Sequence, residues 1–293
     1  AYEITYGDWS SDVCSSDLWS AAVLLAVLSV AAVSTRPAGA RGVDAPWRVV
    51  LLGDSVPAFL VRDALASGWT YFGVEVVSGA QGSCDGMPNL PLLRARDLWN
   101  HIGYLRPPAG CRPWPETYLA PLLAGGRADA AVLMVGQPPI LDVLVDGVWR
   151  GPCDGIGWYL DDVGHRVELL RALGVPPVLA LPAPPGPNSR FMYPDDYAAR
   201  SACVRAGMAR AAARWRVPVI DLAAVLCPDG RVDPCRTTAR DGIHVEAQWA
   251  GPVLDAIVER TWMITSSDRP SPGLHRPSPP RSSMRGHGTS SSG

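Results

Sequence analysis

The stretch "RVVLLGDSVP", residues 48–57, carries an apolar run directly into a glycine, an aspartate and a serine. A continuous apolar run predicts a strand that is buried on both faces of a parallel sheet. The polar residues that follow have two interpretations. Asp54 or Ser55 is an ordinary N-cap for a helix, or Ser55 is a nucleophile at the carboxyl end of a strand, where α/β sheets place their active residues. The choice between these two interpretations depends on other residues of the chain.

The remainder of the chain repeats the strand-and-helix alternation that this stretch begins. Besides residues 47–53, β-rich apolar runs lie at residues 73–78, 129–135, 176–182 and 217–222. Helical patterns lie between and after them, at residues 55–67, 118–123, 156–173, 195–215 and 247–261. Strands that alternate with helices form right-handed βαβ units. We therefore predict a three-layer α/β/α sandwich around a parallel five-stranded sheet.

The ends of the chain do not belong to this predicted domain, which we assign to residues 46–264. Residues 1–18 contain "DWSSDVCSSDL", which resembles the frame translation of a common short-read sequencing adapter, so we exclude them. Residues 19–34 are apolar, and residues 35–45 form a linker. Residues 265–293 are rich in Pro, Ser, Gly and Arg, which predicts a disordered tail.

The apolar segment "WSAAVLLAVLSVAAV", residues 19–33, carries no charge. A spanning helix needs about 20 residues, so we expect a truncated membrane helix or a signal segment, with a buried soluble helix as the alternative. Arg36 and Arg41 on its C-terminal flank argue weakly against export. We expect a domain that is extracytoplasmic and either membrane-anchored through this segment or secreted.

The cysteines favour an exported domain. The sequence has seven, and six remain when Cys14 is excluded with the adapter-like residues: Cys84, Cys111, Cys153, Cys203, Cys227 and Cys235. The number is even and no CxxC pair indicates zinc, so disulfides are expected. Cys227 and Cys235 bracket a short turn-rich loop and are the first predicted pair. Cys84 with Cys111 is the next, which leaves Cys153 with Cys203. Six free thiols in a cytosolic protein are the alternative.

Composition and motifs exclude several classes of function. The net charge of −2 does not indicate a protein that binds nucleic acid. No metal-ligand cluster, P-loop or G-x-G-x-x-G motif is present in the sequence, so we expect neither metal nor cofactor. The missing phosphate-binding loop also argues against a flavodoxin-like nucleotide or flavin binder.

A serine hydroxyl needs a base, and one histidine fits that role. His244 lies in "RDGIHVEAQWAG" before the last predicted helix, with Asp241 three residues ahead of it. A tight Asp-Gly turn can bring that carboxylate to the imidazole and fix its tautomer. The other histidines, His101, His165, His275 and His287, either have no carboxylate at short fixed spacing or lie in the tail. Together, Ser55 and His244 favour catalysis over a simple cap.

The order of "GDSV" (53–56), five βα units and "DGIH" (241–244) resembles the SGNH (GDSL-type) hydrolase family, over about residues 46–262. The resemblance implies a flavodoxin-like sandwich and an esterase, lipase or carbohydrate O-acetylesterase activity. Carried over by motif, it implies Ser55 as the nucleophile, His244 as the base and Asp241 as the partner of His244. The chain lacks G-x-S-x-G at this serine because Pro57 stands at the second glycine, which argues against an α/β-hydrolase elbow.

Three segments resemble one branch of the family more closely. These are "GSCDG" (82–86), "VGQPPILDVLVDGVW" (135–149) and "RDGIH" (240–244). Members with such segments are often extracytoplasmic domains of membrane acyltransferases. The resemblance thus implies a serine esterase or O-acyltransferase acting on an O-acyl, chiefly O-acetyl, ester of a cell-envelope carbohydrate.

The middle motif departs from the family pattern. Members commonly carry Gly-x-Asn after the third strand, where the Asn donates to the oxyanion, but here Gly136 is followed by Gln137, Pro138 and Pro139. Proline has neither an N–H nor a side-chain donor. The expected oxyanion donors are therefore the amides of Ser55, Gly82 (with Gly79 as the alternative) and Gly136, with Gln137 as a possible substitute. A weak or inactive domain that binds glycan or a partner is the competing hypothesis.

Several tryptophans are candidate platforms for sugar rings, although packing in the core or at the rim is the commoner role. They are Trp99, Trp114, Trp149 and Trp158.

Overall fold

The protein was analysed as a computed structural model, which describes residues 45–80, 93–96, 102–105, 112–124, 127–134, 138–183, 197–227 and 243–266. From Pro46 onward, these residues belong to one compact unit. Within the described part of the chain, no helix combines the length and the apolar character that crossing a bilayer requires.

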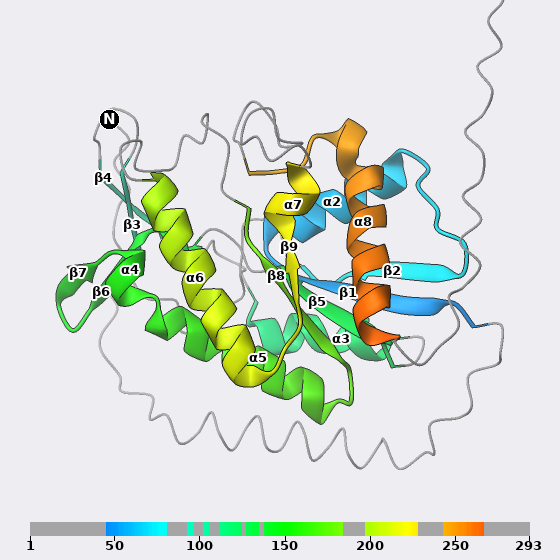
Figure 1. Ribbon diagram of the computed structural model, residues 1–293, viewed down its shortest axis with the longest axis horizontal. Coiled ribbons are helices and arrows are strands. Elements are labelled where there is room, and N and C mark those ends of the chain that lie inside the picture. Colours follow the sequence, from blue (N-terminus) through cyan, green and yellow to red (C-terminus); the bar gives the residue numbers. More distant parts are fainter. Residues whose placement is uncertain are drawn as a thin grey trace, which may run out of the picture. The chain divides into compact units, whose positions relative to one another are not determined.

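The main sheet has five parallel strands in the order β2-β1-β5-β8-β9 (Figure 1). Their bounds are β1 Trp47–Gly53, β2 Val74–Ser78, β5 Ala130–Met134, β8 Pro177–Leu181 and β9 Val219–Asp221. All five predicted strands are confirmed, each within two residues of its expected ends. Strand β2 lies on one side of β1, and β5, β8 and β9 lie on the other. The order therefore reverses at β1, which is where doubly wound sheets place their sites.

Helices cover both faces of this sheet and form the predicted three layers. One face carries α2, α7 and α8, and the other carries α3, α5 and α6. Their bounds are α2 Ser55–Ala66, α3 Trp114–Leu123, α5 Gly157–Ala172, α6 Tyr197–Trp215, α7 Leu222–Leu226 and α8 Ala247–Thr265. Successive residues of β1 alternate between the faces: Val49 and Leu51 pack under α2 and α8, and Val50 and Leu52 under α3 and α5.

A second, antiparallel sheet was not predicted. Its four short strands run in the order β4-β3-β6-β7. They are β3 Leu93–Arg96, β4 Ile102–Leu105, β6 Asp142–Val145 and β7 Val148–Arg150. Strands of three or four residues are too short to show a period of their own. The sequence did contain one signal for a hairpin, the pair Asp146-Gly147 between apolar residues. Both residues have a positive φ, 52° and 74°, as a tight hairpin turn requires.

Ionic and covalent links join the second sheet to α6. The buried Asp142 accepts hydrogen bonds from Arg94 on β3 (2.6 Å) and from Arg200 on α6 (2.7 Å). Arg200 also donates to the carbonyl of Ile140, in the 3-10 turn η1 Pro138–Ile140 (3.0 Å). The disulfide between Cys153 and Cys203 joins the short helix α4 (Pro152–Gly155) to α6.

Candidate active site

Ser55 and His244, which are 189 residues apart in the sequence, are in direct contact. The Nε2 atom of His244 lies 2.8 Å from the Oγ atom of Ser55. Ser55 begins α2 and His244 lies three residues ahead of α8, and both helices start at the carboxyl ends of the strands and pack on the same face. Because the two helices pack against each other, the residues at and just before their N-termini bring the hydroxyl and the imidazole together.

The end of α2 is also linked to α8. Trp69, in the loop that follows α2, donates from its indole nitrogen to Asp255 on α8 (2.9 Å). The ring of Trp69 lies against Gly251, where an added Cβ would come within 3.2 Å of it. These contacts fix the spacing of the two helices, and through it the spacing of Ser55 and His244.

Gly53 makes the turn from β1 to Ser55 possible. Its φ is +149°, and a Cβ there would come within 2.1 Å of the carbonyl oxygen of Met134 on β5. A side chain cannot be accommodated against main chain at that distance, so the turn requires glycine at this position. The glycine of the GDS motif is thus required by the close backbone packing of two neighbouring strands.

Asp54 is the N-cap of α2, as one of the two sequence interpretations had it. Its carboxylate accepts a hydrogen bond from the amide of Val56 (3.0 Å), and the residue is buried. The cap and the nucleophile interpretations are therefore compatible, because the aspartate caps the helix while Ser55 keeps its side chain next to His244. The aspartate of GDS caps the helix, and the serine contacts His244.

Phe59 lies one helical turn after Ser55 and packs against the imidazole. The ring centroids of Phe59 and His244 are 4.6 Å apart, with 41° between the ring planes. The guanidinium of Arg62 lies 4.4 Å from the centroid of the same phenyl ring. Arg62 is hydrogen-bonded to Asp63, which raises the pKa of its guanidinium, so this cation stays charged at any pH of interest. Sequence analysis missed Phe59, although its i+4 spacing from Ser55 places both on one face of α2.

The amides at the start of α2 limit what this helix offers to an oxyanion. The amide of Val56 is already bound to Asp54, and Pro57 has no N–H. The amide of Ser55 lies in the same turn and stays the predicted donor here. The other predicted donors, Gly82, Gly136 and Gln137, lie outside the described residues, and so does Asp241.

Gly79, the alternative donor to Gly82, is described. It follows β2, and its amide donates to the carbonyl of Leu51 (2.8 Å). An added Cβ would lie 2.6 Å from Leu52 and 2.8 Å from Pro121. Close packing of β2 against α3 therefore explains this glycine, and its N–H is engaged in the sheet.

The candidate tryptophans that the structure describes differ in how far they are buried. Trp114 is buried and donates to Asp162 (3.0 Å), which is the packing role that we consider the commoner one for these residues. Trp158 is partly buried and packs against the core. Trp149, on β7, is partly exposed with Arg94 over its ring at 4.5 Å. Trp99 lies outside the described residues.

The cysteine prediction is confirmed where it can be observed. Cys153 and Cys203 form the predicted disulfide. Cys227 is disulfide-bonded as well, and Cys235, the partner expected for it, lies outside the described residues together with Cys84 and Cys111. Among the residues that the structure describes, no group of His, Cys, Asp and Glu side chains could hold a metal ion.

Comparison with known proteins finds similarity in structure only. No protein-family model and no curated protein matches the sequence. Similar solved structures include a GDSL-like lipase from Bacteroides thetaiotaomicron (12% identity, TM-score 0.45, 80% of this chain and 95% of that one). They also include a member of the lipolytic protein G-D-S-L family from Veillonella parvula (13%, 0.45, 72% and 96%). A lipase/acylhydrolase from Enterococcus faecalis is similar too (15%, 0.41, 73% and 95%). At these values we base no functional argument on the likeness.

Proposed function

We propose that this chain is a serine esterase or O-acyltransferase of SGNH type, with Ser55 as nucleophile, His244 as general base and Asp241 as the residue that orients the imidazole. The observation that carries the proposal is the 2.8 Å contact between His244 Nε2 and Ser55 Oγ. That contact lies at the carboxyl edge of the sheet, beside the strand where the order reverses. A hydroxyl within hydrogen-bond reach of an imidazole is the arrangement that nucleophilic acyl transfer needs.

The reaction proceeds through an acyl-serine. Ser55 Oγ attacks the ester carbonyl while His244 Nε2 takes the hydroxyl proton. The tetrahedral oxyanion is stabilised by the amide of Ser55 and further donors. Collapse breaks the bond to the alcohol oxygen, and His244 returns the proton to that leaving group. Water or an acceptor hydroxyl then attacks the acyl carbon, loses its proton to His244 and releases Ser55.

The substrate we propose is an O-acyl, chiefly O-acetyl, ester of a cell-envelope carbohydrate. Hydrolysis and transfer share the first half-reaction, and they differ in whether water or a sugar hydroxyl attacks the acyl-serine. Support for an extracytoplasmic setting comes from the disulfide between Cys153 and Cys203, because such bonds persist in oxidising compartments. The apolar residues 19–33 would hold the domain at the membrane.

The alternative is a catalytically silent domain that binds glycan or a partner. Its support is the pair Pro138-Pro139, where the family pattern has a donor side chain. Pro139 is buried in η1 and adds no donor. Loss of one oxyanion donor costs about a hundredfold or more in rate, so this alternative predicts little or no turnover from an otherwise intact pair of Ser55 and His244.

A fluorophosphonate probe tests the proposal directly, because it labels only an activated serine. We expect labelling of the full chain and turnover of a small acetyl ester, and loss of both in Ser55→Ala. The matched control is Ser67→Ala, at the other end of α2, where the hydroxyl donates to the carbonyl of Ala64 (2.7 Å). Labelling that persists in Ser55→Ala, or is absent from the wild type, would show that Ser55 is not an activated nucleophile.

A further inference from the structure

The two edges of the parallel sheet differ in the apolar side chains that they expose. Ser55 and His244 lie at the edge where the strands end. Among the described residues, seven large hydrophobic side chains are exposed: Leu65, Phe72, Leu123, Val148, Val219, Trp249 and Met263. All of these except Val148 and Trp249 lie at the opposite edge, where the strands begin. We call this the starting edge.

The exposed positions of the starting edge come from separate elements. Leu65 is in the last turn of α2, Phe72 lies two residues before β2, and Met263 is in the last turn of α8. Phe72 is 79% exposed and Met263 67%. Neighbouring Trp69 and Tyr71 lie on the same connection, between α2 and β2. Because these side chains are separated in sequence, a single loose loop does not account for their exposure.

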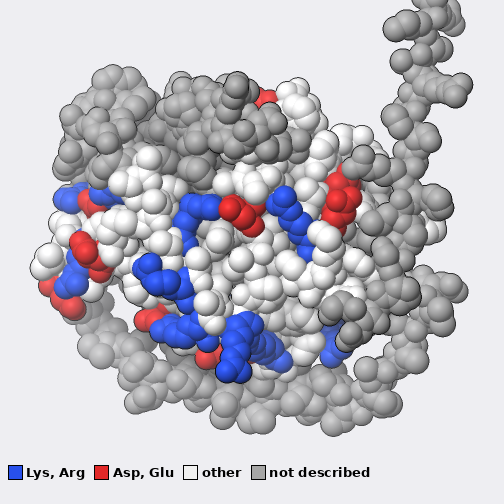
Figure 2. Space-filling view, viewed as in Figure 1, with Lys and Arg blue, Asp and Glu red and all other residues white. Residues whose placement is uncertain are grey.

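Exposed arginines lie at the same edge. Arg171 ends α5, Arg214 and Arg216 lie at the end of α6, and Arg127 precedes β5, all with exposed side chains. Figure 2 shows basic side chains gathered over the adjoining ends of α5 and α6, at the lower centre of the view. Arg171 donates to the carbonyls of Trp215 and Arg216, which holds the ends of these two helices together.

Carboxylates at this edge are fewer, and two of them are bound to Arg48. Asp129 accepts from the amide of Arg48 (2.8 Å), and Glu75 pairs with its guanidinium (3.4 Å). Glu168, in the penultimate turn of α5, is exposed. Asp63, in the last turn of α2, is paired with Arg62. The four exposed arginines together with Arg48 and Arg62 outnumber these four acids, so the edge carries a net positive charge.

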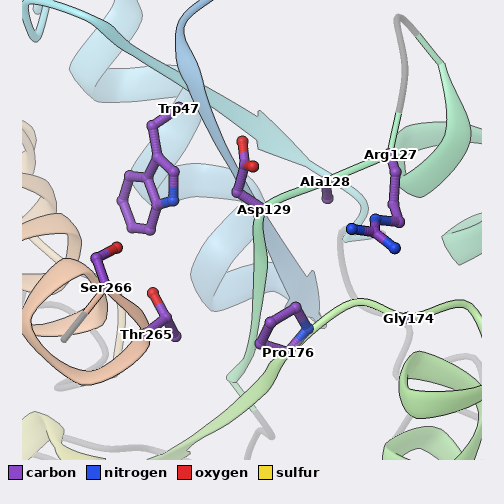
Figure 3. A pocket seen from close by; sticks show the side chains of 8 residues that line it. All are labelled: Trp47, Arg127, Ala128, Asp129, Gly174, Pro176, Thr265 and Ser266. Atoms are coloured by element: carbon purple, nitrogen blue, oxygen red, sulfur yellow. The ribbon is translucent and has the colours of Figure 1, made fainter. Parts of the chain in front are cut away.

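The domain's two chain connections also leave from this edge. A shallow pocket there is lined by Trp47, the first residue of β1, and by Thr265 and Ser266, which end α8 (Figure 3). The rings of Trp47 and Trp262 meet edge to face at 4.9 Å. The thirteen residues 34–46 separate Trp47 from the apolar residues 19–33. Even fully extended, they reach about 45 Å, so an inserted segment 19–33 would keep this edge close to the bilayer.

We propose that the starting edge is a docking surface for an anionic lipid bilayer. Arginine guanidinium groups pair with lipid phosphates, and each basic residue near an anionic leaflet contributes about 1 kcal/mol. Exposed Leu65, Phe72 and Met263 match the apolar groups that enter the headgroup region of an interface. Docked in this way, the domain would present Ser55 and His244 away from the lipid. The proposal concerns binding alone and does not depend on catalysis.

Hydrogen exchange of the full chain on vesicles tests this surface. We expect amides of residues 68–73 and 262–266 to exchange about tenfold more slowly on phosphatidylglycerol vesicles than on phosphatidylcholine vesicles. Amides of residues 54–58 and 243–247, at the catalytic edge, should exchange equally on both. Molar salt should remove the difference, because it screens charge between exposed groups.

Two matched variants give the result its specificity. The double variant Phe72→Ser, Arg214→Gln should lose the protection while residues 19–33 are unchanged. The control Val148→Ser, Arg150→Gln also removes an exposed apolar side chain and an arginine, but from the hairpin of β6 and β7. This control should keep the protection. No protection of the starting edge on anionic vesicles, or equal loss in both variants, would overturn the proposal. Protection of the catalytic edge instead would also overturn it.

Discussion

His244 is contacted on two sides, by the hydroxyl of Ser55 at 2.8 Å and by the ring of Phe59 at 4.6 Å between centroids. An imidazole that must take a proton from Ser55 and return it to a leaving group needs a fixed orientation. The outward-facing part of this stack is Arg62, which lies over Phe59 and is mostly exposed. We therefore assign Phe59 as a positioning residue for the base.

Replacing Phe59 tests that assignment. Phe59→Ala should lower kcat by up to about tenfold, because an aromatic contact contributes about 0.5–1.5 kcal/mol, and should change KM little. Phe59→Tyr should keep most of the rate, because it retains the ring. Steady-state kinetics on an acetyl ester provide the measurement. A change in KM alone, or a loss that Phe59→Tyr shares fully, would contradict a positioning role.

At the residue scale the sequence was enough to identify Ser55 and His244 as partners but not Phe59. Ser55 follows the first strand and His244 precedes the last helix, and the topology of a parallel sheet places both positions at one edge. Phe59 has no such positional constraint. Its contact with His244 depends on how closely α2 and α8 pack, which is set by side chains such as Trp69 and Asp255.

Helix α5 contains a buried ion pair on which the packing of α3 depends. Arg166 is fully buried, pairs with Asp162 (2.7 Å) and donates to the hydroxyl of Tyr118 on α3 (2.7 Å). Trp114 donates to the other carboxylate oxygen of Asp162 (3.0 Å). These bonds join α3 to α5 beneath the sheet.

Removing the guanidinium of Arg166 should lower the free energy of unfolding. Arg166→Ala leaves the carboxylate of Asp162 without its cation and removes a donor to the hydroxyl of Tyr118. Breaking a buried ion pair typically costs about 3–5 kcal/mol. We expect a loss of that size in the free energy of unfolding, measured by urea denaturation. His165→Ala is the control, because His165 is exposed on the same helix. Equal small losses in both variants would show that the buried pair is not needed.

The disulfide between Cys153 and Cys203 closes a separation of 50 residues. Because a bridge chiefly restricts the unfolded chain, Cys153→Ser with Cys203→Ser should lower the free energy of unfolding by about 2–4 kcal/mol. In reductant, which also breaks the disulfide of Cys227, the wild type should match the double variant. If reductant destabilises the double variant as strongly as the wild type, the effect belongs to other cysteines.

The elements of the main sheet could be predicted closely, whereas the second sheet could not. Long apolar runs such as residues 47–53 are specified by burial on both faces, a requirement that is visible in the sequence. The strands Asp142–Val145 and Val148–Arg150 depend on long-range partners, Arg94 and Arg200, that pair with Asp142. Their turn at Asp146-Gly147 was the local signal that sequence analysis did not use.

For the whole molecule, the fold gives the two edges of one sheet different properties. The edge where strands end holds the contact between Ser55 and His244, and the edge where they begin holds exposed arginines and apolar side chains. The first could be inferred from sequence order. The second could not, because an exposed Phe72 and a buried Trp114 are indistinguishable until the helices are packed.

The central claim is that Ser55 forms an acyl-enzyme with the help of His244. The direct test is to mix the full chain with 4-nitrophenyl acetate, quench in acid within the burst phase and map the peptides by mass spectrometry. The account predicts one acetyl group on Ser55 in the wild type, and its loss or slow formation in His244→Ala. Acetylation at other residues only, or equally rapid acetylation of Ser55 without His244, would contradict it.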